Sequence, residues 1–234
     1  IAQRRNLSIF SFSLKKKTSE IYLDFIKKEK LKYKVSININ NFKKYFYLNS
    51  NFDSDIKNLL AAVSIISIFK DIKKLDSNIF YNNKIPEGRG DISKIKLLKK
   101  NFYLIDESYN SNPLSLRSAL KNFDMMQVNN SKKHLVLGDM LELGKHSKKL
   151  HKAISKNINN TSINSVNVVG KYIKETYKNL NKNKKGLILK KNSEIINLIK
   201  SNINNNDYLM IKGSNSTGLN NLTIRIKSGK INDF

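Results

Sequence analysis

A group of hydrogen-bonding side chains stands where a strand-like part of the sequence meets a helix-like part. The string YNSNP, at positions 109–113, follows an apolar run that ends at Asp106 and precedes a segment with helical spacing. Tyr109, Asn110 and Asn112 could bind a ligand there, because a helix N-terminus favours anions and these side chains form hydrogen bonds. The same asparagines could instead form Asx turns and cap the helix. Residue spacing alone favours neither interpretation.

A second group of polar residues lies in the string GDMLELG, at positions 138–144. Asp139 and Glu142 could orient a cation, a ribose or an amine. The alternative, which is commoner for such residues, is that Asp139 caps a turn and Glu142 is solvated.

Lys212 and Ser214 form a third group, directly after the apolar run YLMI. Lys212 could hold a carboxylate or a phosphate, although a surface lysine is the default in this chain. The P-loop pattern requires Lys and Ser or Thr after its second glycine, whereas Leu219 and Asn220 follow Gly218. The sequence therefore contains no P-loop.

The charge balance is strongly basic, with 44 Lys and Arg against 18 Asp and Glu and a net charge of +26. Such a charge suggests an acidic partner. Only five of the basic residues are Arg, the side chain that proteins use for bidentate contacts with bases and phosphates. Because Lys is scattered through an Asn-rich chain, we expect compositional drift and no nucleic-acid partner.

Several other classes of protein are excluded or disfavoured. The absence of Cys excludes a disulfide scaffold, thiolate metal sites and cysteine nucleophiles. His146 and His151 are five residues apart, a poor spacing for one helical face, so no metal site is expected. The longest apolar run, 59–69, is well short of the roughly 20 residues of a spanning helix. We therefore expect no membrane association and a cytoplasmic protein.

The second half of the chain alternates short apolar runs with helix-like segments. This pattern predicts an α/β fold, a Rossmann-like, mostly parallel sheet with helices on both faces. Ligands of such sheets bind beyond the carboxyl ends of the strands, which indicates Asp106, Asp139, Gly170 and Lys212 as candidate site positions. The expected strands are 102–106, 134–139, 165–170, 186–190, 208–213 and 222–226, and the expected helices are 114–127, 148–158, 172–180 and 193–202.

The first half has a different organisation. Short apolar runs between residues 7 and 48 predict several strands, and helical spacing over 55–72 predicts one long helix that Asp55 could cap. Pro and Gly cluster in PEGRGD, at 86–91, where periodicity lapses. We therefore expect one domain over 1–85 and another over 86–234.

Five strings in this order carry a resemblance to a known family. They are PEGRG (86–90), IDESYNSNP (105–113), LGDMLELG (137–144), the Leu150-His151 pair and KGS (212–214). Together they resemble the carboxyl-terminal part of a Mur ligase, in the branch that adds D-Ala-D-Ala. The resemblance spans roughly residues 55–222.

The resemblance implies an ATP-dependent amide ligase of peptidoglycan precursor synthesis. Its substrates would be UDP-MurNAc-tripeptide and D-Ala-D-Ala, with an acyl phosphate as intermediate and Mg²⁺ neutralising phosphate charge. Residues 1–85 would be the tail of the central ATPase domain and 86–234 the Rossmann-like carboxyl-terminal domain of a monomeric enzyme. The family's P-loop and catalytic Lys, Glu and His should lie upstream of residue 1. We therefore expect no catalytic residue in this chain and no acyl phosphate from it alone.

The resemblance also implies roles for individual residues. Arg89 matches an interdomain arginine that contacts ATP, and Asp106 matches the acid that holds the nucleotide ribose. Asn58 matches a string of the central domain that contacts adenine, although Ser54 and Asp55 replace the family's His and Asn. Residues expected to line the dipeptide side of the site are Tyr109, Asn110, Asn112, Asp139 and Glu142, with Lys212 and Ser214 as carboxylate contacts.

Two other functions remain open from sequence. A folylpolyglutamate or cyanophycin synthetase relative would share the Rossmann-like domain, but the YNSNP and GDMLELG strings argue against it. A basic nucleic-acid-binding module would gather Lys with interleaved Tyr or Phe on one face. In this chain Lys occurs on almost every polar segment instead.

Overall fold

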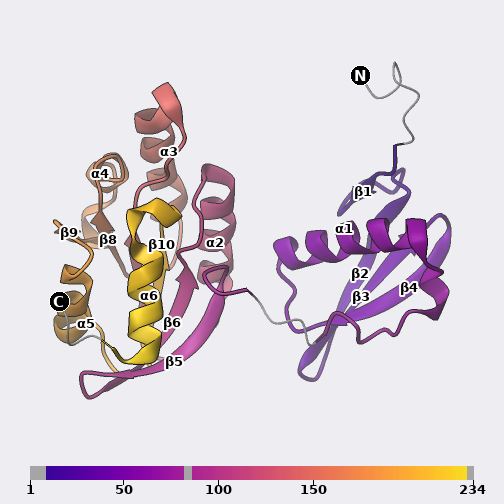
Figure 1. Cartoon of the computed structure of the whole chain (residues 1–234), viewed down its shortest axis with the longest axis horizontal. Helices are drawn as coiled ribbons and strands as arrows, with labels where there is room; N and C mark the ends of the chain where they lie inside the picture. Colours follow the sequence, from indigo (N-terminus) through magenta and orange to yellow (C-terminus); the bar gives the residue numbers. More distant parts are fainter. Residues whose placement is uncertain (1–8, 82–85, 231–234) are drawn as a thin grey trace. The chain divides into compact units, whose positions relative to one another are not determined.

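The computed structural model describes residues 9–81 and 86–230, which form two compact units (Figure 1). The division falls between residues 84 and 85. The first unit contains one small sheet and one long helix, whereas the second contains a six-stranded sheet and five α-helices among its described residues. That the first unit is the tail of an ATPase domain stays a prediction.

The first unit is a four-stranded sheet with a helix packed against one face. Strands β2 to β4 form an antiparallel meander, and the short β1 pairs in parallel with β2. Val35, Ile37 and Phe46 of the sheet are fully buried against helix α1. The helix begins at Asp53 after Phe52, so Asp55 lies in its first turn and the expected cap is wrong. The elements are β1 (Phe12–Ser13), β2 (Ile21–Glu29), β3 (Lys32–Ile39), β4 (Phe42–Leu48), α1 (Asp53–Phe69) and η2 (Ile72–Lys74).

The second unit is built on a six-stranded sheet in the order β5-β6-β10-β7-β8-β9. Every neighbouring pair is parallel except β5 with β6, which is antiparallel. This confirms the predicted fold class, a mostly parallel α/β sheet. The strands are β5 (Asp91–Leu97), β6 (Lys100–Glu107), β7 (Lys133–Leu137), β8 (Ser165–Val169), β9 (Lys185–Leu189) and β10 (Tyr208–Lys212).

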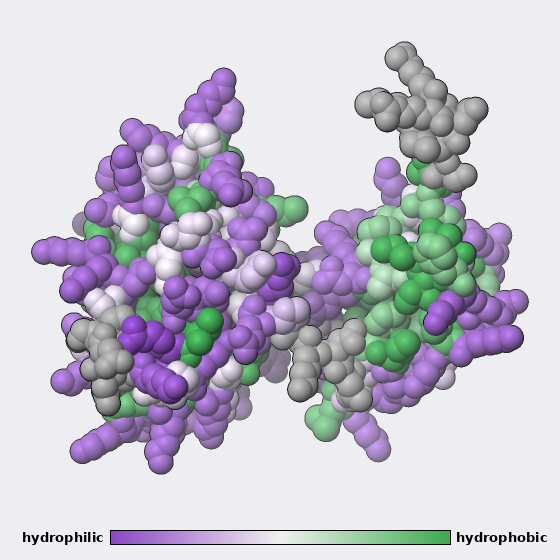
Figure 2. Space-filling model, in the orientation of Figure 1, coloured by the Kyte–Doolittle hydropathy of each residue, from purple (hydrophilic) through white to green (hydrophobic). Residues whose placement is uncertain are grey.

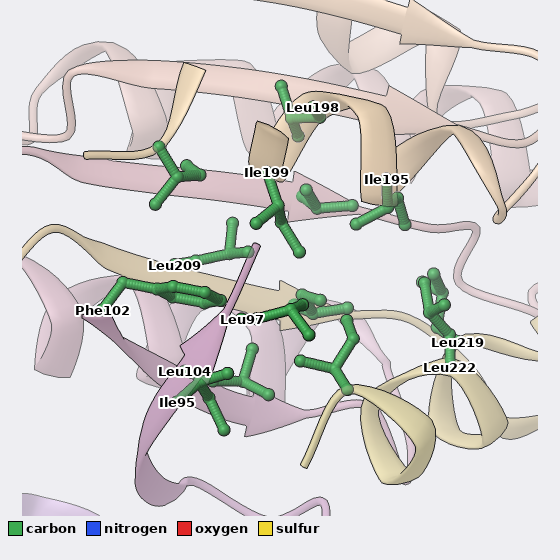
Figure 3. Packing of buried hydrophobic residues seen from close by; sticks show 14 of the residues in the cluster. Ile95, Leu97, Phe102, Leu104, Ile195, Leu198, Ile199, Leu209, Leu219 and Leu222 are labelled. Atoms are coloured by element: carbon green, nitrogen blue, oxygen red, sulfur yellow. The ribbon is translucent and has the colours of Figure 1, made fainter. Parts of the chain in front are cut away.

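Helices cover both faces of this sheet, as the strand-helix alternation predicts. On one face Ile195, Leu198 and Leu222 of α5 and α6 pack with sheet residues such as Leu104 and Leu209 (Figure 3). The other face carries the residues of α2, α3 and α4. The helices are α2 (Pro113–Met125), η3 (Gly144–His146), α3 (Ser147–Asn159), α4 (Lys174–Lys178), η4 (Lys182–Lys184), α5 (Glu194–Asn202), η5 (Asn215–Thr217) and α6 (Leu219–Ser228).

Two elements differ from the prediction. Residues 222–226, expected as a strand, lie in α6, where Leu219, Leu222, Thr223 and Ile226 are buried. That spacing is helical, and it becomes visible only when the segment is extended back to Leu219. The antiparallel edge strand β5 was not predicted at all, because its alternating apolar residues are diluted by lysines.

No helix within 9–81 or 86–230 is both long enough and apolar enough to cross a membrane.

Candidate functional site

The polar strings of the second unit meet at the carboxyl edge of its parallel strands. Lys212 at the end of β10 pairs in register with Glu107 of β6 on one side and with Leu137 of β7 on the other. The YNSNP and GDMLELG strings therefore begin on either side of β10. The start of β5 lies at the same edge, because Asp91 is opposite Asp106.

Lys212 is almost completely buried, with 1% of its surface exposed. Its ammonium donates to the carbonyl oxygen of Asn110 at 2.9 Å and to a carboxylate oxygen of Glu107 at 3.1 Å. A buried charge needs both a counter-charge and hydrogen-bond acceptors, and Glu107 and the loop carbonyl supply them. Lys212 therefore fixes the start of the YNSNP loop.

Ser214 connects the two polar strings across the sheet edge. Its hydroxyl donates to the carbonyl of Ser111 at 3.2 Å and accepts from the backbone N–H of Leu141 at 2.9 Å. Its own backbone N–H donates to the carbonyl of Asp139 at 3.0 Å. One buried serine thus holds the YNSNP and GDMLELG loops together.

Asp139 holds the loop that follows the next strand, β8. Its two carboxylate oxygens accept from the backbone N–H groups of Lys171, at 2.9 Å, and Ile173, at 2.7 Å. Gly170 lies so close that a Cβ there would be 2.7 Å from the Asp139 carboxylate. Glu142, by contrast, is exposed, and its backbone adopts a left-handed conformation with a φ of +62°. Of these two acids, Glu142 has the more accessible carboxylate.

The asparagines of the YNSNP loop form local turn contacts. Asn112 caps α2 by accepting from the backbone N–H of Ser115 at 2.8 Å, and Ser115 reciprocates in a capping box. Asn110 accepts from the N–H of Ser111 at 2.7 Å. Both asparagines are exposed. The hydroxyl of Ser111 is buried without a hydrogen-bond partner among the described residues.

Arg89 lies beside this loop on the PEGRGD turn. Its guanidinium is 4.5 Å from the centre of the Tyr109 ring, and both side chains are exposed. The turn is held by a hydrogen bond from the N–H of Tyr109 to the carbonyl of Gly88, 3.0 Å long. Gly88 has a φ of +74°, and a Cβ there would be 2.9 Å from the Cβ of Tyr109. Glycine is therefore required for the turn to approach Tyr109.

Asp106 is completely buried and ion-paired. One oxygen accepts from Lys227 of α6 at 2.6 Å, and the other accepts from Ser108. The ammonium of Lys227 also lies 2.6 Å from Asp91, which in turn accepts from the N–H of Gly88 at 2.7 Å. Asp106, Lys227 and Asp91, here called the acid-lysine-acid triad, thus fix the turn that carries Arg89.

The two acids of the triad change the pKa of Lys227. Burial alone would lower the pKa of Lys227, but hydrogen bonds and attraction from Asp106 and Asp91 outweigh it and raise the pKa above its usual 10.5. Lys227 escaped the sequence analysis, because no local signal separates it from the other lysines of the chain. The expectation that Asp106 holds a ribose stays a prediction; both of its oxygens already accept hydrogen bonds within the chain.

His151 supports the GDMLELG loop from α3. Its Nε2 accepts from the backbone N–H of Met140 at 3.0 Å, and its Nδ1 lies 2.8 Å from the carbonyl of Ser147. A nitrogen that accepts from an N–H carries no proton, so the ring is neutral with its proton on Nδ1. His151 therefore positions the loop as a neutral hydrogen-bond acceptor.

Asn58 belongs to the first unit, where it is exposed on α1. The residues described at the carboxyl edge can bind anions through Arg89 and polar groups through Asn110 and Asn112. No group of three or more His, Asp or Glu that could hold a metal occurs in the described parts of the chain.

Comparison with known proteins identifies the family. Residues 94–215, just over half of the chain, match the family described as Mur ligase, glutamate ligase domain. The chain belongs to the Mur ligase family. The match covers most of the strands of the second unit, from within β5 to just past β10.

Two relatives are similar to this chain in amino-acid sequence. A Buchnera aphidicola (Acyrthosiphon pisum) protein named UDP-N-acetylmuramoyl-tripeptide--D-alanyl-D-alanine ligase is 38% identical over 124 residues, 52% of this chain and 26% of that protein. A Rickettsia prowazekii protein of the same name is 27% identical over 176 residues, 75% of this chain and 37% of the relative.

Solved structures give the same fold. MurF from Acinetobacter baumannii matches with a TM-score of 0.76 at 19% identity, over 96% of this chain and 48% of that one. MurF from Thermotoga maritima, solved with ADP, matches with a TM-score of 0.72 at 15% identity, over 92% and 47%. The chain thus spans about half of these structures and at most 37% of the two relatives described above.

Proposed function

We propose that this chain is the carboxyl-terminal part of the ligase that adds D-Ala-D-Ala to UDP-MurNAc-tripeptide, the activity called MurF. The observation that carries the proposal is that three relatives of 27–38% identity all bear that enzyme's name. The YNSNP and GDMLELG loops, joined through Ser214, support it because they form one continuous polar edge.

The proposed reaction has two steps. The tripeptide carboxylate takes the γ-phosphoryl group of ATP, which releases ADP and leaves an acyl phosphate. The amine of D-Ala-D-Ala then attacks the acyl carbon, the C–O bond to phosphate breaks, and phosphate leaves while the amine loses a proton. Catalysis of this kind depends on positioning and on stabilising negative charge.

In this proposal Arg89 supplies positive charge toward the nucleotide phosphates. Its guanidinium is exposed, and stacking on Tyr109 restricts its orientation, so the charge is held in place before a nucleotide arrives. The triad serves this function by fixing the turn under Arg89. Any contact of Asp106 with the ribose would require its carboxylate to leave Lys227.

The dipeptide side would be formed by the two loops. Exposed Glu142 attracts the ammonium of D-Ala-D-Ala, and the amides of Asn110 and Asn112 donate to its carbonyl or carboxylate oxygens. Asp139, Lys212 and Ser214 act through the loops that they fix, since their polar groups are buried and engaged. Lys212 and Ser214 were expected as direct carboxylate contacts; the hydrogen bonds described above favour the indirect role.

Mg²⁺ does not fit the described residues, because no acidic cluster among them could hold it. We propose that the family's ATPase half would bind it.

The test joins this chain to the amino-terminal half of the Buchnera aphidicola relative. Phosphate release from ATP is measured with UDP-MurNAc-tripeptide, with and without D-Ala-D-Ala. We expect turnover that depends on the dipeptide and falls about 100-fold or more in Arg89→Ala, the usual cost of losing a group that stabilises developing charge. Arg117→Ala, an exposed arginine on α2, is the matched control and should retain activity.

Two results would contradict the proposal. Turnover that requires glutamate or another amino acid in place of the dipeptide would assign the chain to a different ligase of the superfamily. Phosphate release by the 234-residue chain alone, dependent on the tripeptide, would show that it needs no ATPase half.

A further inference from the structure

The hairpin of strands β2 and β3 ends in a turn that carries a highly exposed leucine. Glu29 is opposite Lys32 in the ladder, so the turn consists of Lys30 and Leu31. Leu31 is 88% exposed, the largest value among the large hydrophobic residues that the structure describes. A single exposed leucine is common at protein surfaces, so its meaning depends on the residues around it.

Lysines surround this leucine on both strands. Residues 27–34 contain five lysines and one glutamate, a net charge of +4. Lys27, Lys28 and Lys30 are exposed and form no ion pair with another described residue. Lys27 also lies directly opposite Lys34 in the ladder, where like charges repel each other and destabilise the hairpin. An anionic partner would relieve that repulsion.

Charge alone would not single out this hairpin. Figure 2 shows hydrophilic side chains over most of the visible surface, in keeping with the lysine content of the chain. The hairpin differs because its charges surround an exposed apolar side chain. Lys30 has a φ of +52°, a conformation that glycine and asparagine adopt more readily, and the next turn of the same sheet uses Asn40 and Asn41 at such angles.

A nucleic acid and a bilayer with anionic lipids would both match the charge. A single-stranded nucleic acid would stack its bases on exposed aromatic rings. The ammonium of Lys32 lies 3.4 Å from the centre of the Tyr47 ring and occupies one of its faces. Lys34 covers Tyr45 in the same way at 4.1 Å. Stacking there would displace both lysines and make no use of Leu31, whereas a bilayer would use the lysines and the leucine together.

We propose that the β2–β3 turn binds the surface of bilayers that contain anionic phospholipids. Leu31 enters the acyl boundary, and the three exposed lysines meet the lipid phosphates. Strands rise about 3.3 Å per residue, so Lys27 and Lys28 stand about 10–13 Å behind Leu31, at the level of the headgroups. The expectation of no membrane association came from the short apolar run at 59–69, and a surface site needs no spanning segment. The inference does not depend on the proposed ligase activity.

The chain contains no tryptophan, which makes one introduced tryptophan a specific probe. Leu31→Trp places it at the hairpin tip. Leu98→Trp, in the two-residue turn between β5 and β6, is the matched control, since Leu98 is also an exposed leucine in a hairpin turn. Emission of each 234-residue variant is recorded with vesicles of phosphatidylcholine, and with equimolar phosphatidylcholine and phosphatidylglycerol. Lipids brominated on their acyl chains quench a tryptophan only if it enters the bilayer.

We expect the emission of Leu31→Trp to shift to shorter wavelength with the anionic vesicles and to be quenched by the brominated acyl chains. Vesicles of phosphatidylcholine alone should produce neither effect, and Leu98→Trp should show neither effect with any vesicle. Sedimentation with anionic vesicles then measures affinity, which Leu31→Ser should lower about tenfold, the usual cost of leaving a leucine in water.

The contribution of the lysines is measured in the same sedimentation assay. A variant with Lys27, Lys28 and Lys30 all replaced by Gln should bind anionic vesicles about 100-fold more weakly, because each lysine near such a surface contributes about fivefold. The control removes three exposed lysines from the β5–β6 hairpin and should lose less than about fivefold. Its substitutions are Lys94→Gln, Lys96→Gln and Lys99→Gln.

Three results would overturn the inference, once circular dichroism has shown an unchanged fold for each variant. The first is an unshifted emission of Leu31→Trp with anionic vesicles. The second is an equal loss of affinity in the two triple variants, because the attraction would then come from the net charge of the whole chain. The third is binding of a labelled single-stranded oligonucleotide that the Lys27 triple variant loses, without insertion of Leu31→Trp into vesicles, which would assign the hairpin to nucleic acid.

Discussion

The ammonium of Lys227 lies 2.6 Å from the carboxylate of Asp106, which is 121 residues earlier in the chain. Asp106 is fully buried, whereas the Lys227 side chain is 17% exposed. The pair joins α6 to the carboxyl end of β6, and the second bond from Lys227 to Asp91 extends this connection to the turn under Arg89. The position of Arg89, near the start of the second unit, therefore depends on a residue near the end of that unit.

Removing the lysine should destabilise the second unit strongly. Lys227→Met leaves Asp106 buried without its counter-charge, and breaking a buried ion pair from one side costs about 3–5 kcal/mol. The free energy of unfolding is measured by urea titration with circular dichroism. Lys178→Met, which removes an exposed pair with Glu175, is the control and should lower the free energy of unfolding far less than Lys227→Met does, because solvent screens exposed ion pairs. A cost for Lys227→Met as small as the control would contradict the importance of the triad.

Replacing two serines of the site, Ser111 and Ser214, with alanine should have different effects on stability. Ser111→Ala removes a buried hydroxyl that has no described partner, so stability should stay the same or rise by up to about 1–3 kcal/mol. Ser214→Ala removes the links to Ser111 and Leu141 and should cost about 1–3 kcal/mol. Thermal unfolding of the two variants side by side measures the difference, and equal losses would refute it.

Gly170→Ala should be destabilising for two reasons. Its φ of +137° is rare for residues with a side chain, and the new Cβ would lie 2.7 Å from the Asp139 carboxylate. We expect a loss of about 1–3 kcal/mol in the free energy of unfolding, together with displacement of the loop after β8. Gly144→Ala also has a positive φ, +51°, but nothing within 4 Å of its Cβ. The difference between the two variants isolates the contact with Asp139, and its absence would contradict the described geometry.

Stability should fall on mild acidification because of His134. Burial lowers the pKa of this imidazole below 6.5, and the neighbouring Asp207 opposes the shift only in part. His134 therefore binds a proton more tightly in the unfolded chain than in the folded one. The stability that the neutral, buried His134 gives the fold is fully present above about pH 6.5, and it is lost as the pH falls toward the pKa of His134 in the folded state. His134→Gln should reduce the slope of unfolding free energy against pH between about 5 and 7, whereas exposed His146→Gln should not. Identical slopes in the wild type and His134→Gln would contradict this account.

The local pattern of the chain was sufficient to predict the class of the second unit. Apolar runs and helical periods are properties of neighbouring residues, and they placed β6, β7, β8, β9 and β10 within two residues. The error at 222–226 has a local cause, since the alternation of LTIRI imitates a strand while the buried Leu219 that completes the helical period lies three residues earlier.

The site was harder to predict, because its contacts join distant segments. Nothing in the residues around Lys212 indicates that its ammonium reaches the carbonyl of Asn110, 102 residues away. Asp106 was expected at a ligand, and only the tertiary structure shows that Lys227 lies against it. Asn112, for which both roles were open, caps α2.

The place of β10 in the sheet has a consequence for synthesis on the ribosome. This strand comes last among the described strands yet lies between β6 and β7, which share no ladder with each other. The nascent chain must therefore emerge beyond Lys212 before the two parts of the sheet can join, and until then both strands present open, apolar edges. A stalled or truncated translation product that stops before β10 would be an aggregation-prone chaperone client rather than a smaller folded domain.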